Sequence, residues 1–164
     1  MRAMNKKDGS LSKKAEAGND PVLIKDLMQP VTTETIFLED SQVSELLQVY
    51  TRHSDILSFY VTDSEGRLLG QIGLEHLADF IYPEACRRSF LGHGILRQIT
   101  TESCKQMINH RVIAVHRQDD LGTAVEKMTR HKILEMPVID EDGKIEGVVR
   151  LSTLLCHRLM ENKE

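Results

Sequence analysis

The hydrophobic and polar positions of the first half of the chain predict two helices separated by a β-hairpin. Residues 56–62 are rich in β-branched and aromatic side chains and predict a strand, and residues 67–73 resume as a strand after a short polar turn. Residues 74–81 have a helical pattern. Asp40 or Ser41 is expected to cap the helix before the hairpin, whose apolar face consists of Val43, Leu46, Leu47 and Tyr50.

Shorter elements are expected upstream. Residues 22–28 are apolar at helical spacing and predict a short helix, which Pro30 ends. Residues 35–38 predict a short strand. Residues 1–20 are polar and lack periodicity, which predicts a flexible tail that is either solvated or in contact with an acidic partner.

The second half repeats this order of elements. Thr100 or Thr101 is expected to cap a short helix that runs through Met107, and a strand is expected at residues 111–115. Asp119 or Asp120 is expected to cap the next helix, whose apolar face consists of Leu121, Ala124, Val125 and Met128. A strand, a turn, another strand and a helix follow, at 133–139, 140–143, 144–150 and 151–160.

The repeat is also visible in the residues themselves. A constant offset of 77 aligns FYVTDSEGRLLGQIG at 59–73 with MPVIDEDGKIEGVVR at 136–150. The glycines in the turns predict a positive φ, and those in the strands predict close packing or a bulge. The alignment pairs these glycines as Gly66 with Gly143 and Gly70 with Gly147.

Neither half is large enough to be stable alone, because units of roughly 60 residues bury little apolar surface. We therefore predict an α/β (α+β) fold of two β-α-β-β-α units, packed sheet to sheet about a pseudo-twofold axis with a cleft between them. The expected divisions are the tail, the first unit, a connecting segment and the second unit, at 1–20, 21–83, 84–100 and 101–164.

Composition narrows the class of function. The 164 residues carry a net charge of -4, with 4% aromatic residues and no Trp, which argues against nucleic-acid binding. No apolar run reaches the ~20 residues of a membrane helix, and the N-terminus lacks a signal-peptide core. The cysteines are few and widely spaced, as in a reducing compartment. We expect a cytoplasmic protein without membrane insertion.

The segment MPVIDEDGKIEGVV resembles the CBS domain family, whose usual run is a hydrophobic residue, Pro-Val-Val-Asp, two polar residues, Gly and a strand with a second Gly. In the first unit Tyr60 replaces the proline and Thr62 replaces a hydrophobic residue. The resemblance implies a CBS pair, or Bateman module. Such modules commonly bind AMP, ATP or related adenosyl ligands between their units, form homodimers, and regulate an enzyme, channel or transporter. No cofactor is required.

The resemblance also implies a ligand site in the cleft. In nucleotide-binding members, a Ser or Thr is followed three residues later by an Asp that binds the ribose hydroxyls. Arg150 and Thr153 stand at these positions in the second unit, and Gly73 and His76 in the first, so neither unit has the Asp. The ligand-binding residues expected are Thr33, Phe59, Tyr60, His76, Arg111, Ile113, Met136, Pro137, Val138, Arg150 and Thr153.

Several of these residues have an alternative role. Arg150 either contacts a phosphate or lies exposed at a strand end, paired with Asp140 or Glu146. Residues 136–137 either line a slot for a flat ring or only pack the core between the units. His76 is either a ligand contact or an ordinary histidine on a helix surface.

Three functions are compatible with the sequence. The first is a regulatory module that senses a small ligand, an adenosine-type nucleotide or other anion, and signals to a partner. The second is a ligand-free dimerisation module, which the missing ribose carboxylates favour. The third is a metal or pH sensor, although the seven histidines lack a metal-ligand spacing. The sequence contains no nucleophile elbow, phosphate loop or paired-carboxylate signature, so we expect no catalytic residues.

Overall fold

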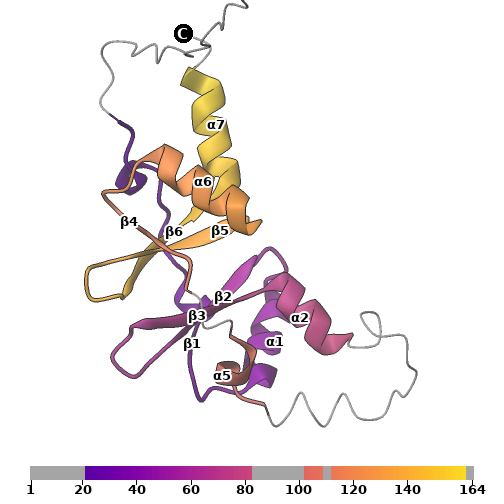
Figure 1. The fold of residues 1–164 in the computed structure, drawn as a ribbon. Coiled ribbons are helices and arrows are strands. Elements are labelled where there is room, and N and C mark those ends of the chain that lie inside the picture. Colours follow the sequence, from indigo (N-terminus) through magenta and orange to yellow (C-terminus); the bar gives the residue numbers. More distant parts are fainter. Residues whose placement is uncertain (1–20, 83–101, 109–111, 162–164) are drawn as a thin grey trace, which may run out of the picture.

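The protein, seen in a computed structural model, consists of two units that each contain a three-stranded sheet and helices (Figure 1). The structure describes residues 21–82, 102–108 and 112–161. The predicted tail and connecting segment lie outside these residues. The predicted α/β fold with two sheets is confirmed.

The first unit has its sheet in the order β1-β2-β3, with β1 parallel and β3 antiparallel to β2. A helix connects the parallel strands, and a second helix follows the hairpin directly. In chain order, the elements are a 3-10 turn η2 (Thr33–Thr35), β1 (Ile36–Leu38), α1 (Val43–Arg52), β2 (Ser58–Thr62), β3 (Leu68–Gly73) and α2 (Leu74–Ile81).

The second unit repeats this arrangement in the order β4-β5-β6. Its elements are β4 (Val115–His116), α6 (Leu121–His131), β5 (Glu135–Ile139), β6 (Ile145–Arg150) and α7 (Leu151–Glu161). The symmetry extends to irregularities, because the hairpin register shifts at Val61/Thr62 and again at Val138/Ile139. Gly66 and Gly143 have φ angles of 82° and 80°, as the turns predicted.

Each unit has its own hydrophobic core, and each core is completed by a short segment that precedes the other unit in the chain. Ile24, in the 3-10 turn η1 (Ile24–Asp26), is buried with the core of the second unit, which includes Met136 and Val138. Cys104, in α5 (Cys104–Met107), is buried with the core of the first unit. Figure 1 shows the indigo start of the described chain beside the second unit and α5 beside α1. The residues of each core therefore do not all come from the continuous stretch of sequence that was predicted for that unit.

The cap residues of two helices differ from the sequence predictions. The N-cap of α1 is Gln42, without a side-chain cap bond, so Asp40 and Ser41 were wrong. The N-cap of α5 is Ser103, and its N–H donates to Gln106 Oε1 at 3.2 Å. The predicted caps Thr100 and Thr101 lie outside the described residues. The starts of α1 and α5 pack against each other, and Val43 N–H donates to the carbonyl of Glu102 at 3.0 Å. This packing explains why the cap residues differ from those predicted.

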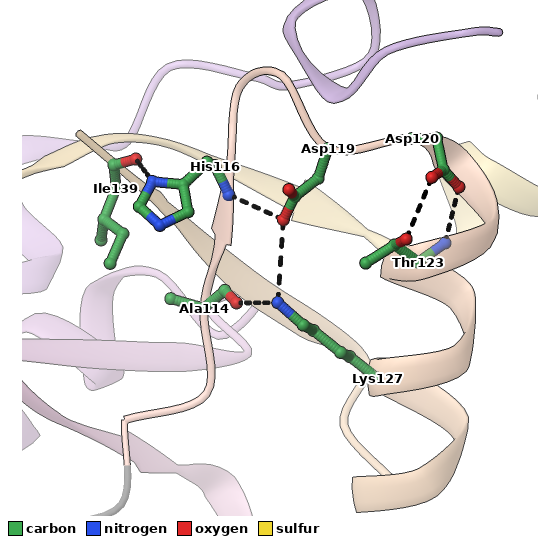
Figure 2. Close-up of polar contacts among 7 residues, drawn as sticks. All are labelled: Ala114, His116, Asp119, Asp120, Thr123, Lys127 and Ile139. Carbon is green, nitrogen blue, oxygen red and sulfur yellow. Dashed lines mark hydrogen bonds and ion pairs between the residues drawn. The ribbon is translucent and has the colours of Figure 1, made fainter. Parts of the chain in front are cut away.

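A cap and a strand of the second unit are fixed by the polar contacts in Figure 2. Asp120 is confirmed as the cap of α6, because its carboxylate accepts hydrogen bonds from the N–H and the hydroxyl of Thr123 at 2.9 and 3.0 Å. The strand predicted at 111–115 is wrong in extent, since β4 begins at Val115. The carbonyl of Ala114 instead accepts from Lys127 Nζ at 3.0 Å, so a side chain takes the place of a sheet partner.

Candidate functional site

A cavity lies between the two units where the start of the described chain crosses the end of β6. It is open to solvent and contains roughly 620 Å³ of space free of protein atoms, open solvent included. The first unit and its leading segment contribute residues from 29 to 35 and from 53 to 60, and the second unit contributes Glu135, Val148 and Arg150.

One wall of this cavity depends on a glycine. Gln29 and Val148 form an antiparallel bridge, with N–H to carbonyl distances of 2.8 and 2.9 Å in the two directions. A Cβ at Gly147 would lie 2.6 Å from the carbonyl oxygen of Gln29. Only glycine lets the two backbones approach this closely, which is the physical reason for the strand glycine noted in the sequence.

The floor of the cavity is a polar triad that joins the two units. Tyr60, 1% exposed on β2, donates from its hydroxyl to Glu135 Oε1 at 2.8 Å. Glu135, 5% exposed on β5, accepts from Arg150 Nε at 2.7 Å through its other oxygen. Burial raises the pKa of Tyr60 well above its ordinary value, and the adjacent Glu135 charge raises it further. Tyr60 therefore remains a hydrogen-bond donor.

The backbone of Glu135 also contacts the first unit, through the side chain of Gln71. Gln71 Nε2 donates to Ser58 Oγ at 2.6 Å and to the backbone carbonyl of Glu135 at 3.2 Å. Ser58 and Glu135 occupy the same position in the two repeats. The paired strand starts of the two units are thus bound together by side chains from the first unit.

The outer rim of the cavity is acidic. Glu34 Oε2 lies 3.1 Å from His53 Nε2, and both side chains are about half exposed. Asp55 lies close enough to Arg150 to help raise the pKa of the guanidinium, after the larger effect of the hydrogen bond to Glu135. The cavity lining therefore contains the carboxylates Glu34, Asp55 and Glu135 against the guanidinium of Arg150.

The repeat generates a second, related hollow on the other side of the pseudo-twofold axis. It contains roughly 730 Å³ of space free of protein atoms, open solvent included, and residues of both units line it. Gln71 and Gly73 stand here at the repeat positions of Val148 and Arg150. This hollow thus has no guanidinium at the position where the first cavity has one.

The side chain of Glu75 covers that position. A Cβ at Gly73 would lie 2.5 Å from Glu75 Oε1, so the carboxylate packs against the glycine. His76 Nδ1 is 3.4 Å from the same oxygen, yet it is buried without a hydrogen bond within the described part of the chain.

The structure divides the site residues expected from the sequence between the two cavities. Tyr60 and Arg150 come together in the first, and His76 and Ile113 in the second. Thr33 is exposed and does not line the first cavity, although Thr32 and Thr35 do. The remaining described residues line neither: Phe59, Met136 and Val138 belong to the two cores, Pro137 is buried and Thr153 is half-buried on α7. Arg111 lies outside the described residues.

Glu135 is the central residue that sequence reasoning missed. One alternative considered for Arg150 was a pair with Asp140 or Glu146, but Arg150 pairs with Glu135, and Glu146 pairs with Arg117 at 3.4 Å. The available signal was a charged residue inside the otherwise apolar run of residues 133–139. Asp55 and the leading segment at 29–32 were missed as well, because their proximity depends on how the two units pack.

Two other findings bear on function. Within the described ranges, no group of three or more His, Cys, Asp or Glu side chains is placed to hold a metal ion. Nor is any helix in those ranges long and apolar enough to cross a membrane.

Comparison with known proteins gives a consistent family. The sequence profile of the CBS domain matches residues 24–83 and 104–159. The structure is similar to CBSX2 in complex with AMP, at 16% identity and a TM-score of 0.67, covering 85% of this chain and 98% of that chain. It is also similar to the CBS domain pair of protein MJ0100 in complex with 5′-methylthioadenosine and S-adenosyl-L-methionine, at 18% identity and a TM-score of 0.63, covering 88% and 100%.

A channel domain is a further structural relative. The cytosolic domain of the Mg²⁺ channel MgtE in complex with ATP is 25% identical, with a TM-score of 0.60. The match covers 80% of this chain and 46% of that chain.

Proposed function

The chain belongs to the CBS domain family, and from that premise we propose that it is a regulatory module that binds an adenosyl-type ligand between its two units. The observation that supports this proposal is the first cavity, which is lined by residues of both units. A ligand there contacts both units at once, so it favours one relative arrangement of them. Such a preference is what a ligand needs in order to shift a conformational equilibrium.

The Tyr60–Glu135–Arg150 triad provides the link between ligand and arrangement. It lies on the cavity floor and crosses from β2 of the first unit to β5 and β6 of the second. Any ligand group that changes the contacts of Glu135 or Arg150 therefore changes an interaction between the units. The proposed role of the protein is regulatory rather than catalytic. The partner that responds to the change between the units is an enzyme, channel or transporter in the cytoplasm.

Thermal unfolding of the full chain tests this function. We expect AMP, ATP, adenosine, S-adenosylmethionine or a related adenosyl compound to raise the melting temperature, because a ligand that binds the folded state stabilises it by mass action. The increase should saturate with ligand concentration. If no adenosyl compound changes the melting temperature at millimolar concentration, the proposed function is wrong.

A ligand-free dimerisation module is the second candidate, and an apolar surface favours it. Leu155 and Leu159 are 51% and 65% exposed one helical turn apart on α7, and Met160 is 70% exposed beside them. Exposed apolar rows of this kind commonly mark protein contacts. A concentration-dependent dimer combined with no response to any adenosyl compound would favour this candidate. Loss of the dimer in Leu155→Glu with Leu159→Glu would locate the contact on α7.

A further inference from the structure

The charge distribution of the first cavity defines which adenosyl ligands it accepts. Glu34, Asp55 and Glu135 line it, and Arg150 is the guanidinium that opposes them. Even with His53 protonated beside Glu34, the described lining carries more negative than positive charge. A cavity of this kind attracts cations and repels anions.

Arg150 offsets only one of these three carboxylates, because its guanidinium is paired with Glu135. Glu135 holds the guanidinium through Nε at 2.7 Å, and Asp55 is a second nearby carboxylate. A phosphate group at Arg150 would meet Glu135 and Asp55 at close range. It would also have to share the guanidinium with the Glu135 carboxylate, which already accepts from Arg150 Nε, and two anions at one cation repel each other.

From this arrangement we infer that the cavity selects an uncharged or cationic nucleoside and rejects the corresponding phosphate. The inference rests on the proposed function and specifies its ligand class. Glu135 is the specificity-determining residue, since its carboxylate lies beside Arg150 where the phosphate of a ligand would otherwise bind. The carboxylates of the rim accept hydrogen bonds from the hydroxyls of a sugar, and they also attract a positive centre such as a sulfonium.

Isothermal titration of the full chain tests the inference with ligands that differ in charge. Adenosine and AMP form the matched pair, and 5′-methylthioadenosine and S-adenosylmethionine extend the series to another uncharged compound and to a cation. The buffer contains EDTA and little salt, so that no divalent ion screens the phosphate. We expect adenosine to bind at least about tenfold more tightly than AMP, because like charges at close range oppose binding.

Glu135→Gln provides the decisive variant, because glutamine keeps the size of the side chain and a hydrogen-bonding group but removes the charge. We expect the preference for adenosine over AMP to fall by about tenfold or more in this variant. Asp55→Asn, at an exposed loop position, should shift the same ratio in the same direction if Glu135→Gln does not fold. Glu146→Gln is the matched control, since Glu146 pairs with Arg117 and does not line the cavity.

The outcomes separate the inference from the proposed function. If AMP binds as tightly as adenosine or more tightly, the charge selection is wrong while the proposed function stands. An adenosine-to-AMP ratio that stays the same in both the Glu135 and Asp55 variants overturns the role given to these carboxylates. If none of the four compounds binds, both the inference and the proposed function are wrong.

Discussion

Tyr60 and Glu135, 75 positions apart in the sequence, form a 2.8 Å hydrogen bond across the interface of the two units. Tyr60 stands where the family's usual run has a proline, and a proline cannot donate a hydrogen bond from its side chain. The departure from the family pattern therefore has a structural role. It joins the units at the floor of the cavity, and it holds one oxygen of Glu135 while Arg150 holds the other.

Tyr60→Phe should destabilise the folded protein by about 1–2 kcal/mol, because it leaves a buried carboxylate oxygen without its donor. The change removes a single oxygen atom and keeps the ring, so packing is largely preserved. Equilibrium unfolding in urea, followed by circular dichroism, measures the effect. Tyr82→Phe is the control at a tyrosine that is 65% exposed, and it should have almost no effect. Equal effects of the two substitutions would contradict the assigned role of the Tyr60 hydroxyl.

Gly147→Ala should destabilise the protein by about 1–3 kcal/mol, since the added methyl group has no free volume to enter. Its Cβ would lie 2.6 Å from the carbonyl oxygen of Gln29, which is backbone and cannot rotate away. The bridge between Gln29 and Val148 forms a cavity wall, so ligand affinity should fall together with stability. Thermal unfolding and ligand titration of the same variant check both effects.

Gly66→Asn is a suitable control for this substitution. Gly66 has a φ of 82° in the turn of the first hairpin, and no atom lies within 4 Å of where its Cβ would be. Asparagine tolerates this backbone region better than other side chains do. Its effect should be a fraction of that of Gly147→Ala. A larger loss of stability at Gly66 would indicate that backbone strain, rather than the contact with Gln29, limits these glycines.

Local sequence patterns predicted the elements because each element depends on nearby residues. The turn glycines, the helical faces and the cap at Asp120 are decided within a few positions along the chain. The caps of α1 and α5 were missed because segments distant in sequence pack there. The site was predicted less well for the same reason, since Tyr60, Glu135 and Arg150 become neighbours only when the two units assemble.

Asp120→Ala should cost about 1 kcal/mol of stability at neutral pH, as expected for a helix N-cap. The backbone N–H of Thr123, and then its hydroxyl, lower the pKa of Asp120 below the unfolded value. The contribution of Asp120 is therefore fully present above its unfolded pKa and is lost as the pH falls through its folded pKa. Urea unfolding at several pH values from neutral to strongly acidic measures this change.

Asp120→Asn separates the charge from the cap. Asparagine accepts the same backbone hydrogen bond, so stability at neutral pH should remain close to that of the natural chain. Toward acidic pH the natural chain should become less stable than the Asn variant, because only Asp120 can be protonated there. If the natural chain instead gains stability relative to the variant as the pH falls, the sign assigned to this carboxylate is wrong.

Cys104 should resist thiol reagents in the folded protein, whereas Cys156 should react. Cys104 is fully buried, and burial together with the nearby Glu45 charge raises its pKa to about 11. At mildly basic pH its reactive thiolate is therefore scarce as well as inaccessible. Cys156 is exposed on α7. Peptide mass spectrometry after timed labelling with a maleimide distinguishes the two sites.

The labelling also tests how the two units share their cores. Cys104 precedes the second unit in the chain but is buried in the core of the first, where its N–H donates to the carbonyl of Ser41 at 2.8 Å. We expect labelling of Cys104 to begin only in the range of urea concentrations that unfolds the protein. Lys105→Ala removes the 2.5 Å contact between Lys105 Nζ and Glu39 Oε2, and it should accelerate Cys104 labelling without changing that of Cys156. If both cysteines react at the same rate in the native protein, α5 is not held in the core of the first unit.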